Sequence, residues 1–440
     1  MQERDPAAGD TGHRRPRPGS PFAAAAPSIT LAVAYAVGVG VWLAAGDVLP
    51  GGRWLAVHIF TLGVLTNLVL TFSEHFGRTV TRTSGERRGW WPLITNAGVL
   101  AVLVGLPTGQ RWLLGAGATT VTVSVFAAYR RLRRMRRTSL GARFGWIVRI
   151  YERAHGAFIH GAVLGAVLGI GVVPGTWYSG VRAAHLHANV LGWGGLTLLA
   201  TLVFFGPTMA RTRIEPGADG RAARALRHGA TGLTIAVLAL VLTGWDGVVG
   251  TVAHGVAAVG LLAYTVAAVT VCLPVGRAVY TAKRTAPRPL VLMVCVWLPL
   301  VAGLDTLVVV TTSWRWLDAL GVVALAGVLA QAILATLVYL APMLRGGTTT
   351  AREVIRRRLE VGLTTRAVLV NLGVAMTAAG AAPVAADLPL TAVGWSAVAT
   401  AVLVTLLTAL WPVRAPDPPS VAHRPGHRVV GRGPTGRAAE

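Results

Sequence analysis

Four histidines, His58, His185, His187 and His254, are the side chains of this sequence best suited to chemistry. Each lies near the start of a long apolar stretch, and neutral imidazole is a common ligand of haem iron and of copper. His185 and His187 are two residues apart, so on a helix their side chains point about 200° apart. One metal can bind both only if the helix start is unwound. Otherwise they serve two sites, or one is a ligand while the other faces a neighbouring helix or the aqueous rim.

The stretches that carry these histidines are long and apolar enough to cross a bilayer. The chain has 440 residues, of which 53% are hydrophobic and 13% charged, and its mean hydropathy is +0.59. A helix needs about 20 mostly apolar residues to span the hydrocarbon. Twelve such stretches are predicted, at about 27–46, 53–73, 91–107, 112–129, 156–174, 184–206, 229–244, 250–273, 289–311, 317–342, 367–383 and 391–412. Residues 1–26 and 413–440 are rich in Pro, Gly, Arg and Ala and predict a disordered cytoplasmic leader and tail.

The basic residues set the expected orientation. The formal net charge is +24, with 41 Lys and Arg. If the N-terminus is cytoplasmic, only Arg53, Arg111, Arg182 and Arg315 fall on the outer side, which satisfies the positive-inside rule in every loop. The sequence therefore predicts a multi-pass protein of the plasma (cytoplasmic) membrane with both termini cytoplasmic and the lipid bilayer as its partner. The run RRLRRMRR (130–137) is interpreted as a topology anchor, and nucleic acid is not an expected partner.

The chain repeats itself. LATLVFFGP at 199–207 returns as LATLVYLAP at 334–342, and His58 precedes Gly63 by five residues as His187 precedes Gly192. Matching helix counts and loop polarity predict three four-helix units, at about 27–130, 154–275 and 289–412. The second helix of each unit, here called its B helix, covers 53–73, 184–206 or 317–342. The expected fold is an all-α integral membrane domain (27–412) of twelve transmembrane helices in three pseudo-threefold four-helix units.

Further polar residues lie within the apolar spans. Asp305, in VAGLDTLVVV, is the one acid well inside a span, and His155 and His160 begin the fifth span. Ionisable groups at membrane depth are costly and are functional candidates by default. His155 and His160 fit a proton path or structural polar contacts, and Asp305 fits the same two roles. Trp54 is interpreted as an interfacial belt residue and Asn189 as a helix-packing amide.

Twelve spans in three units, with histidines near the outer ends of the B helices, resemble subunit I of the haem–copper oxidases. LAVHIFTLGVLTNLVLTFSEHFGRTVTRT looks like the helix of those proteins that carries a low-spin haem ligand, and HLHAN resembles the histidine-bearing helices of NnrS-like haem and copper membrane proteins. The resemblance implies a haem between His58 and either His187 or His185, with His187 favoured by its place in the repeat. It also implies a second metal or a propionate contact at His254. The third B helix has no histidine, and the copper-site histidines and the nearby tyrosine motif are missing, so no oxygen-reducing centre is expected.

The resemblance therefore implies a membrane haem protein that also has copper as a candidate cofactor, with a role in redox chemistry, nitric oxide handling or metal supply to a redox or copper protein partner. The chain is not expected to be a complete terminal oxidase, and it has no Walker A, GxSxG or HExxH motif. Two alternatives stay open: a transporter or permease with a histidine-lined path, and a degenerate paralogue with structural roles only.

Overall fold

The computed structural model describes residues 25–45, 48–83, 90–139, 144–283, 285–345, 348–383 and 389–411, and every regular element within them is a helix. Residues 1–24 and 412–440 lie outside this description, so the predicted disorder of the leader 1–26 and the tail 413–440 stays a prediction.

Eleven of the described helices are long and apolar enough to cross a membrane, which confirms a multi-pass, all-α membrane protein. They are α1 (Ala26–Ala45), α2 to α3 (Gly52–Thr81), α5 (Arg111–Thr138), α6 (Gly145–Ile170), α7 to α8 (Gly175–Met209), α9 (Ala218–Leu242), α10 (Val248–Thr281), α11 (Arg288–Val310), η4 to α13 (Trp314–Leu344), α15 (Leu363–Gly380) and α16 (Leu390–Leu410). The third predicted span is shorter, since α4 (Trp91–Gly105) has 15 residues.

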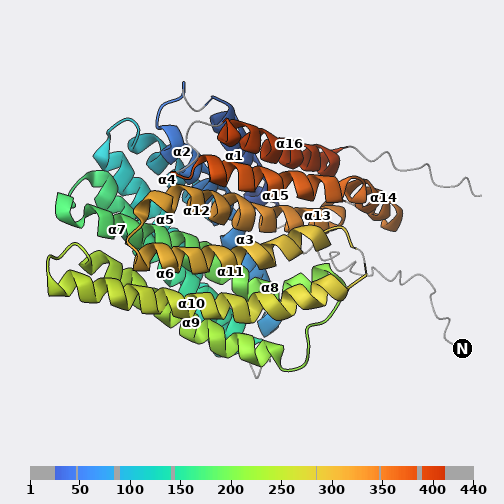
Figure 1. Cartoon of the computed structure of the whole chain (residues 1–440). Coiled ribbons are helices and arrows are strands. Elements are labelled where there is room, and N and C mark those ends of the chain that lie inside the picture. The colour runs from blue at the N-terminus through green and yellow to red at the C-terminus, as the bar shows by residue number, and fades with distance from the viewer. Residues whose placement is uncertain are drawn as a thin grey trace, which may run out of the picture.

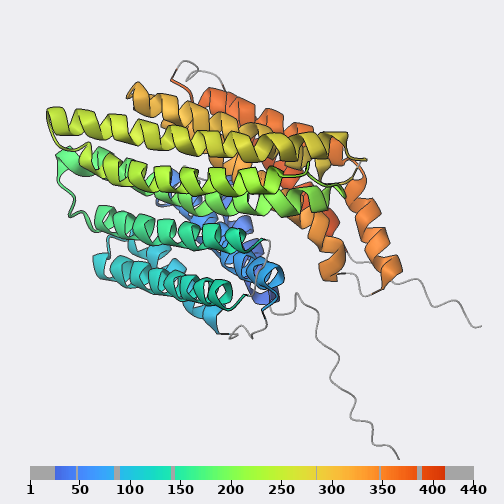
Figure 2. The ribbon, with the colours of Figure 1, turned by 90° about the horizontal axis from the view of Figure 1, so that it is seen from below.

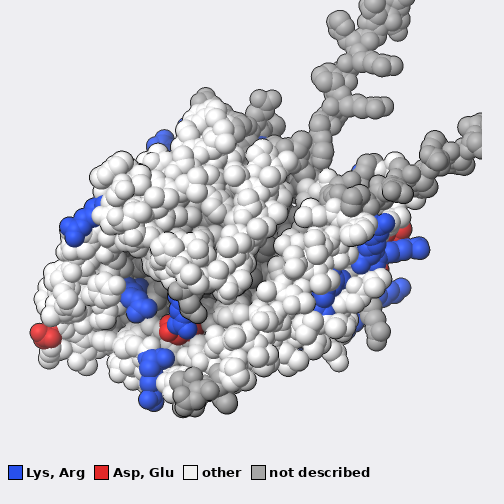
Figure 3. All heavy atoms as spheres, turned by 90° about the horizontal axis from the view of Figure 1, so that it is seen from above, with Lys and Arg blue, Asp and Glu red and all other residues white. Residues whose placement is uncertain are grey.

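The helices lie roughly side by side along one direction, as Figures 1 and 2 show. Large apolar side chains point outward from them: Val259 on α10 is 69% exposed and Leu238 on α9 is 58% exposed. Exposed apolar side chains on this scale would be unfavourable in water, whereas lipid tails solvate them. On the face in Figure 3 the middle region is uncharged, and the charged side chains lie toward the two ends.

One amphipathic helix, α14 (Thr349–Glu360), lies between two spans where the sequence predicted only a loop. Thr348 caps it by accepting a hydrogen bond from the Ala351 amide at 3.1 Å. Its ion pairs join Glu353 to Arg356 and Arg357. The guanidinium of Arg356, followed by that of Arg357, lowers the pKa of the Glu353 carboxyl to about 2. The charge of Glu353 is therefore retained at every physiological pH.

Each of the three B-helix regions contains a π-helical segment. These are η2 (Ile59–Leu65), η3 (Ala188–Gly195) and η5 (Val323–Ala330), and they follow directly on His58, His187 and Val322. A glycine, Gly63, Gly192 or Gly327, stands five residues after each of those positions. The segments pack on α1, α6 and α11, respectively. π-Helical turns are rare and frequently mark functional sites, so their recurrence directs attention to the side chains beside them.

In three helix pairs the backbones are in close contact at glycines. The pairs are α4 with α5, α9 with α10 and α15 with α16. The crossing glycines are Gly98 with Gly117, Gly232 with Gly260, and Gly373 with Gly394. In each pair a Cβ added to one glycine would lie 2.3 to 3.0 Å from the carbonyl oxygen of the other. Small residues let membrane helices approach this closely. Figures 1 and 2 show the three pairs at separate places on the periphery of the bundle.

Replacing Gly260 by valine is expected to lower the free energy of unfolding by about 1–3 kcal/mol, because the new Cβ overpacks the crossing. At this position a Cβ would lie 2.3 Å from the Gly232 oxygen. Gly255→Val, on the same helix, is the matched control, since a Cβ there meets nothing within 4 Å. Unfolding in mixed detergent micelles measures both. Equal stability of the two variants would contradict the close crossing.

Candidate cofactor site

Two of the predicted histidines face each other across neighbouring B helices. His58 ends α2 (Gly52–His58) and His185 lies on α7 (Gly175–His187). Their ring centres are 6.3 Å apart and their planes differ by 14°. α7 is helical through both His185 and His187, so the helix start is not unwound and the two side chains leave it on different sides. The structure thus brings His58 together with His185.

Both facing rings are anchored through the same nitrogen. Nδ1 of His58 donates to the Trp54 carbonyl at 2.8 Å, and Nδ1 of His185 donates to the Gly161 carbonyl at 2.7 Å. A carbonyl only accepts, so the proton of each neutral ring is on Nδ1 and the lone pair is on Nε2. Metal-binding histidines are commonly held this way, with the second nitrogen donating to a backbone carbonyl. The arrangement leaves two Nε2 atoms for a ligand.

Neighbouring residues fix the two rings further. The Trp54 indole stacks on His58, with ring centres 4.0 Å apart. Against His185 lies the bare backbone of Gly165, where a Cβ would come within 2.5 Å of the imidazole Cε1. Asn189 donates from Nδ2 to the His185 carbonyl at 2.8 Å. The imidazoles are therefore held by packing and hydrogen bonds before any ligand binds, as a binding site requires.

The separation of the rings suits a shared metal centre. Two imidazoles on opposite sides of one metal ion have ring centres about 6 Å apart, since each metal–nitrogen bond is about 2 Å long. Within the described ranges no three His, Cys, Asp or Glu side chains are grouped to hold an ion. A bare ion that needs three or four protein ligands is therefore not matched by this pair. A haem asks the protein only for ligands above and below its iron, because its macrocycle occupies the other iron positions.

His187, the favoured ligand from sequence, is engaged elsewhere. Its Nε2 lies 2.9 Å from the Oδ2 of Asp305 on α11, and its Nδ1 lies 2.7 Å from the Ala183 carbonyl. The side chain of His187 is 3% exposed and that of Asp305 is 12% exposed. Both ring nitrogens are used, and one proton is shared between the imidazole and the carboxyl group. The structure therefore joins α7 to α11 through a buried pair that no sequence pattern connects.

The hydrogen bonds of the remaining predicted residues go to groups outside the facing pair. His155 is fully buried, its Nδ1 donates to Tyr151 at 2.7 Å, and its Nε2 has no hydrogen-bond partner among the described residues. Its ring is nearly perpendicular to that of Trp193, and the two ring centres are 4.7 Å apart. His160 is exposed and bonds to the carbonyl of Gly156 on its own helix at 2.8 Å.

His254 also bonds within its own helix, to the Gly250 carbonyl at 3.0 Å, and its ring lies 6.4 Å from Trp314. Neither contact brings a second candidate ligand to His254, so they give no support to a second metal at this position.

Sequence reasoning missed three contributors to the site. The sequence pattern predicts Trp54 at the membrane interface and Asn189 in helix packing, and no pattern points to the carbonyl of Gly161. The spacing of Trp54 to His58 and of His185 to Asn189 is four residues in each case, which places each pair on one helix face. That spacing could have linked Trp54 to His58 and Asn189 to His185 from the sequence.

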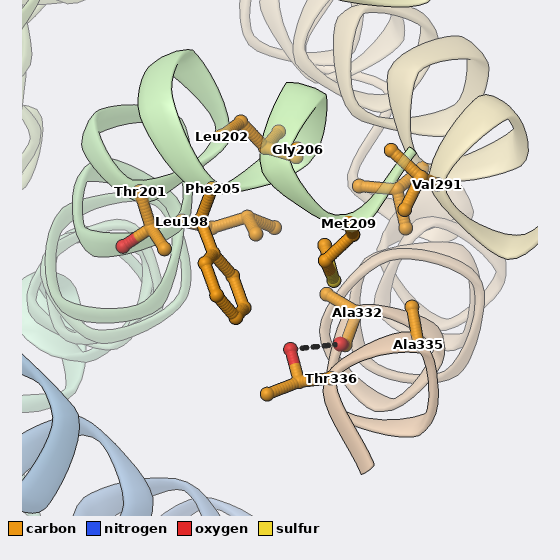
Figure 4. A pocket seen from close by; sticks show the side chains of 11 residues that line it. Leu198, Thr201, Leu202, Phe205, Gly206, Met209, Val291, Ala332, Ala335 and Thr336 are labelled. Carbon is orange, nitrogen blue, oxygen red and sulfur yellow. Dashed lines mark hydrogen bonds between the residues drawn. The ribbon is translucent and has the colours of Figure 1, made fainter. Parts of the chain in front are cut away.

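A small cavity lies away from the histidines, between α8 (Leu196–Met209), α11 and α13 (Gln331–Arg345). Its volume is about 20 Å³, and Phe205, Met209 and Ala335 are among the side chains that line it (Figure 4). The Thr336 hydroxyl at its edge donates to the Ala332 carbonyl at 2.9 Å. The cavity has room for about one small molecule the size of water, which is too little for a cofactor.

Comparisons with known proteins give no family assignment: no protein-family model matches the chain, and no curated protein matches it.

Proposed function

We propose that this protein is an integral membrane haem protein of the haem–copper oxidase-like superfamily, similar to its NnrS-like branch, and that His58 and His185 would hold the haem. The observation that carries the proposal is the pair of facing, Nδ1-anchored imidazoles with ring centres 6.3 Å apart. The structure therefore favours His185 over His187 as the second ligand.

When bound, a haem supplies reversible one-electron chemistry at its iron. The residues of the chain have separate tasks. The Trp54 and Gly161 carbonyls hold the tautomers in which Nε2 is free to bind, and the Trp54 indole covers one face of His58. A site with apolar surroundings and only two protein ligands for the iron suits redox chemistry, nitric oxide handling or metal supply to a redox or copper protein partner. Oxygen reduction is not proposed, because the third B helix has no histidine.

The proposed architecture is twelve spans in three four-helix units, with both termini on the cytoplasmic side of the plasma membrane. This number is reached by adding the shorter helix α4, the third along the chain, to the eleven longer spans. Three π-helical segments after equivalent positions and three glycine crossings between the third and fourth helices of each unit support the repeat. Concentration of Lys and Arg in alternate loops supports the orientation.

The test is the absorbance spectrum of the purified full-length protein. Haem ligation predicts a Soret band that shifts on reduction and that is lost in His58→Ala. A protein without a Soret band after expression with ample haem would overturn the proposal. Metal analysis of the same sample tests copper, which also accepts imidazole ligands, as the alternative occupant.

A second candidate function, proton-coupled transport, is favoured by one observation. Asp305 and His187 form a buried protonatable pair between two spans, and such pairs line proton and substrate paths in membrane proteins. Proton flux in proteoliposomes that is lost in Asp305→Asn, in a protein with no bound haem, would support this function in place of the first.

A further inference from the structure

The arginine-rich end of α5 divides into two sets with different surroundings. In the run 130–137 six of the eight residues are arginine. Arg131 and Arg136 turn toward the protein: Arg131 Nε lies 3.3 Å from Glu74 on α3 (Thr66–Thr81), and Arg136 binds Glu152 on α6 at 2.6 and 3.1 Å. Those two arginines hold α5 to its neighbours. They are not available to an external ligand.

The other four arginines form a single exposed stripe. They stand at positions i, i+3, i+4 and i+7, which share one face of a helix, and they are Arg130, Arg133, Arg134 and Arg137. Within the described chain none of the four is ion-paired with a carboxylate. The stripe is therefore four concentrated positive charges that no carboxylate of the described residues neutralises. We call it the arginine stripe.

Aromatic side chains mark where the arginine stripe meets the membrane. Phe126, one turn before it, is 46% exposed, and the Arg130 guanidinium lies 6.0 Å from its ring centre. The Tyr129 hydroxyl accepts from Arg133 at 3.4 Å. The preceding turns of α5 belong to its apolar span, and aromatic residues concentrate at the boundary between hydrocarbon and headgroups. The stripe follows these aromatic residues, so we expect its guanidinium groups to lie at the depth of lipid phosphates.

We propose that the arginine stripe is a binding site for the phosphate groups of anionic phospholipids. A guanidinium binds phosphate through two parallel hydrogen bonds, and juxtamembrane basic clusters attract anionic leaflets. The charge, the spacing and the depth of the stripe all fit this ligand. The site does not depend on a haem, so the experiment that tests it is independent of the proposed function.

The test is native mass spectrometry of the full-length protein taken from nanodiscs of equal phosphatidylglycerol and phosphatidylcholine. Wild-type protein is expected to retain phosphatidylglycerol preferentially. Replacing the four stripe arginines by glutamine is expected to reduce that preference by about tenfold. The matched control replaces four other exposed arginines by glutamine and removes the same charge: Arg211, Arg213, Arg224 and Arg227.

Retention of the preference in the control, with loss in the stripe variant, supports the site. Equal loss in both variants, or no loss in the stripe variant, overturns it. Changing the four stripe arginines to lysine keeps the charge and removes the paired hydrogen bonds, so a partial loss of preference is expected. Inorganic phosphate is expected not to displace the lipid; displacement at millimolar phosphate would identify a site for the free anion and overturn the lipid assignment. Size-exclusion chromatography confirms that each variant is folded.

Discussion

Purified His185→Ala protein is expected to contain at least about tenfold less haem than the wild type, because loss of an axial ligand weakens binding more than loss of an outer contact, which itself costs 10–100-fold. His187→Ala is expected to keep most of its haem, since both nitrogens of His187 are bonded to protein groups. Haem content per protein, measured by the pyridine haemochrome method, separates the two variants.

Added imidazole offers a control on that result. In His185→Ala the small ligand can enter the space left by the side chain, so haem content is expected to recover in part. The adjacent histidine makes the comparison sharp, because both positions are on α7 and two residues apart. If His187→Ala loses the haem and His185→Ala keeps it, the ligand favoured by the repeat is correct and the facing pair is not the site.

Removing one member of the His187–Asp305 pair is expected to lower the free energy of unfolding by about 3 kcal/mol. His187 and Asp305 are bonded at 2.9 Å in the interior, so either single replacement leaves a buried polar group without its partner. The double variant His187→Leu with Asp305→Leu removes both groups. Its destabilisation is expected to fall below the sum of the two single leucine variants by about 1–3 kcal/mol.

Unfolding in mixed micelles measures this cycle. Thr306→Val with Thr265→Val is the control, since these hydroxyls are bonded at 3.1 Å between α11 and α10 without any charge. The coupling of that neutral pair is expected to be smaller. Strictly additive effects of the His187 and Asp305 replacements would show that the two groups do not interact in the membrane.

Hydropathy predicted most of the fold, because a span must bury its backbone in hydrocarbon and so needs a long apolar run. All twelve predicted stretches correspond to helices, although α4 is only 15 residues long. α14 escaped prediction because its arginines and glutamates have no apolar run, and its helical form depends on a cap and on ion pairs along the helix. The π-helical segments do not follow from hydropathy, although a glycine recurs at the same place in each of them.

The candidate site was predictable only in part. His58 and the presence of a histidine partner followed from residue type and position. The choice between His185 and His187 depends on how α7 is rotated against α2, α6 and α11, and periodicity gives the angle between two side chains without giving that rotation. Asp305 is 118 residues from His187 along the chain, so only the tertiary structure joins them.

The most direct measurement of the central claim is the low-temperature electron paramagnetic resonance spectrum of the oxidised, purified wild-type protein. Axial ligation by His58 and His185 predicts a low-spin ferric signal of a haem with two imidazole ligands. A high-spin signal of a haem with a single protein ligand, or no ferric haem signal in a haem-replete preparation, would contradict it.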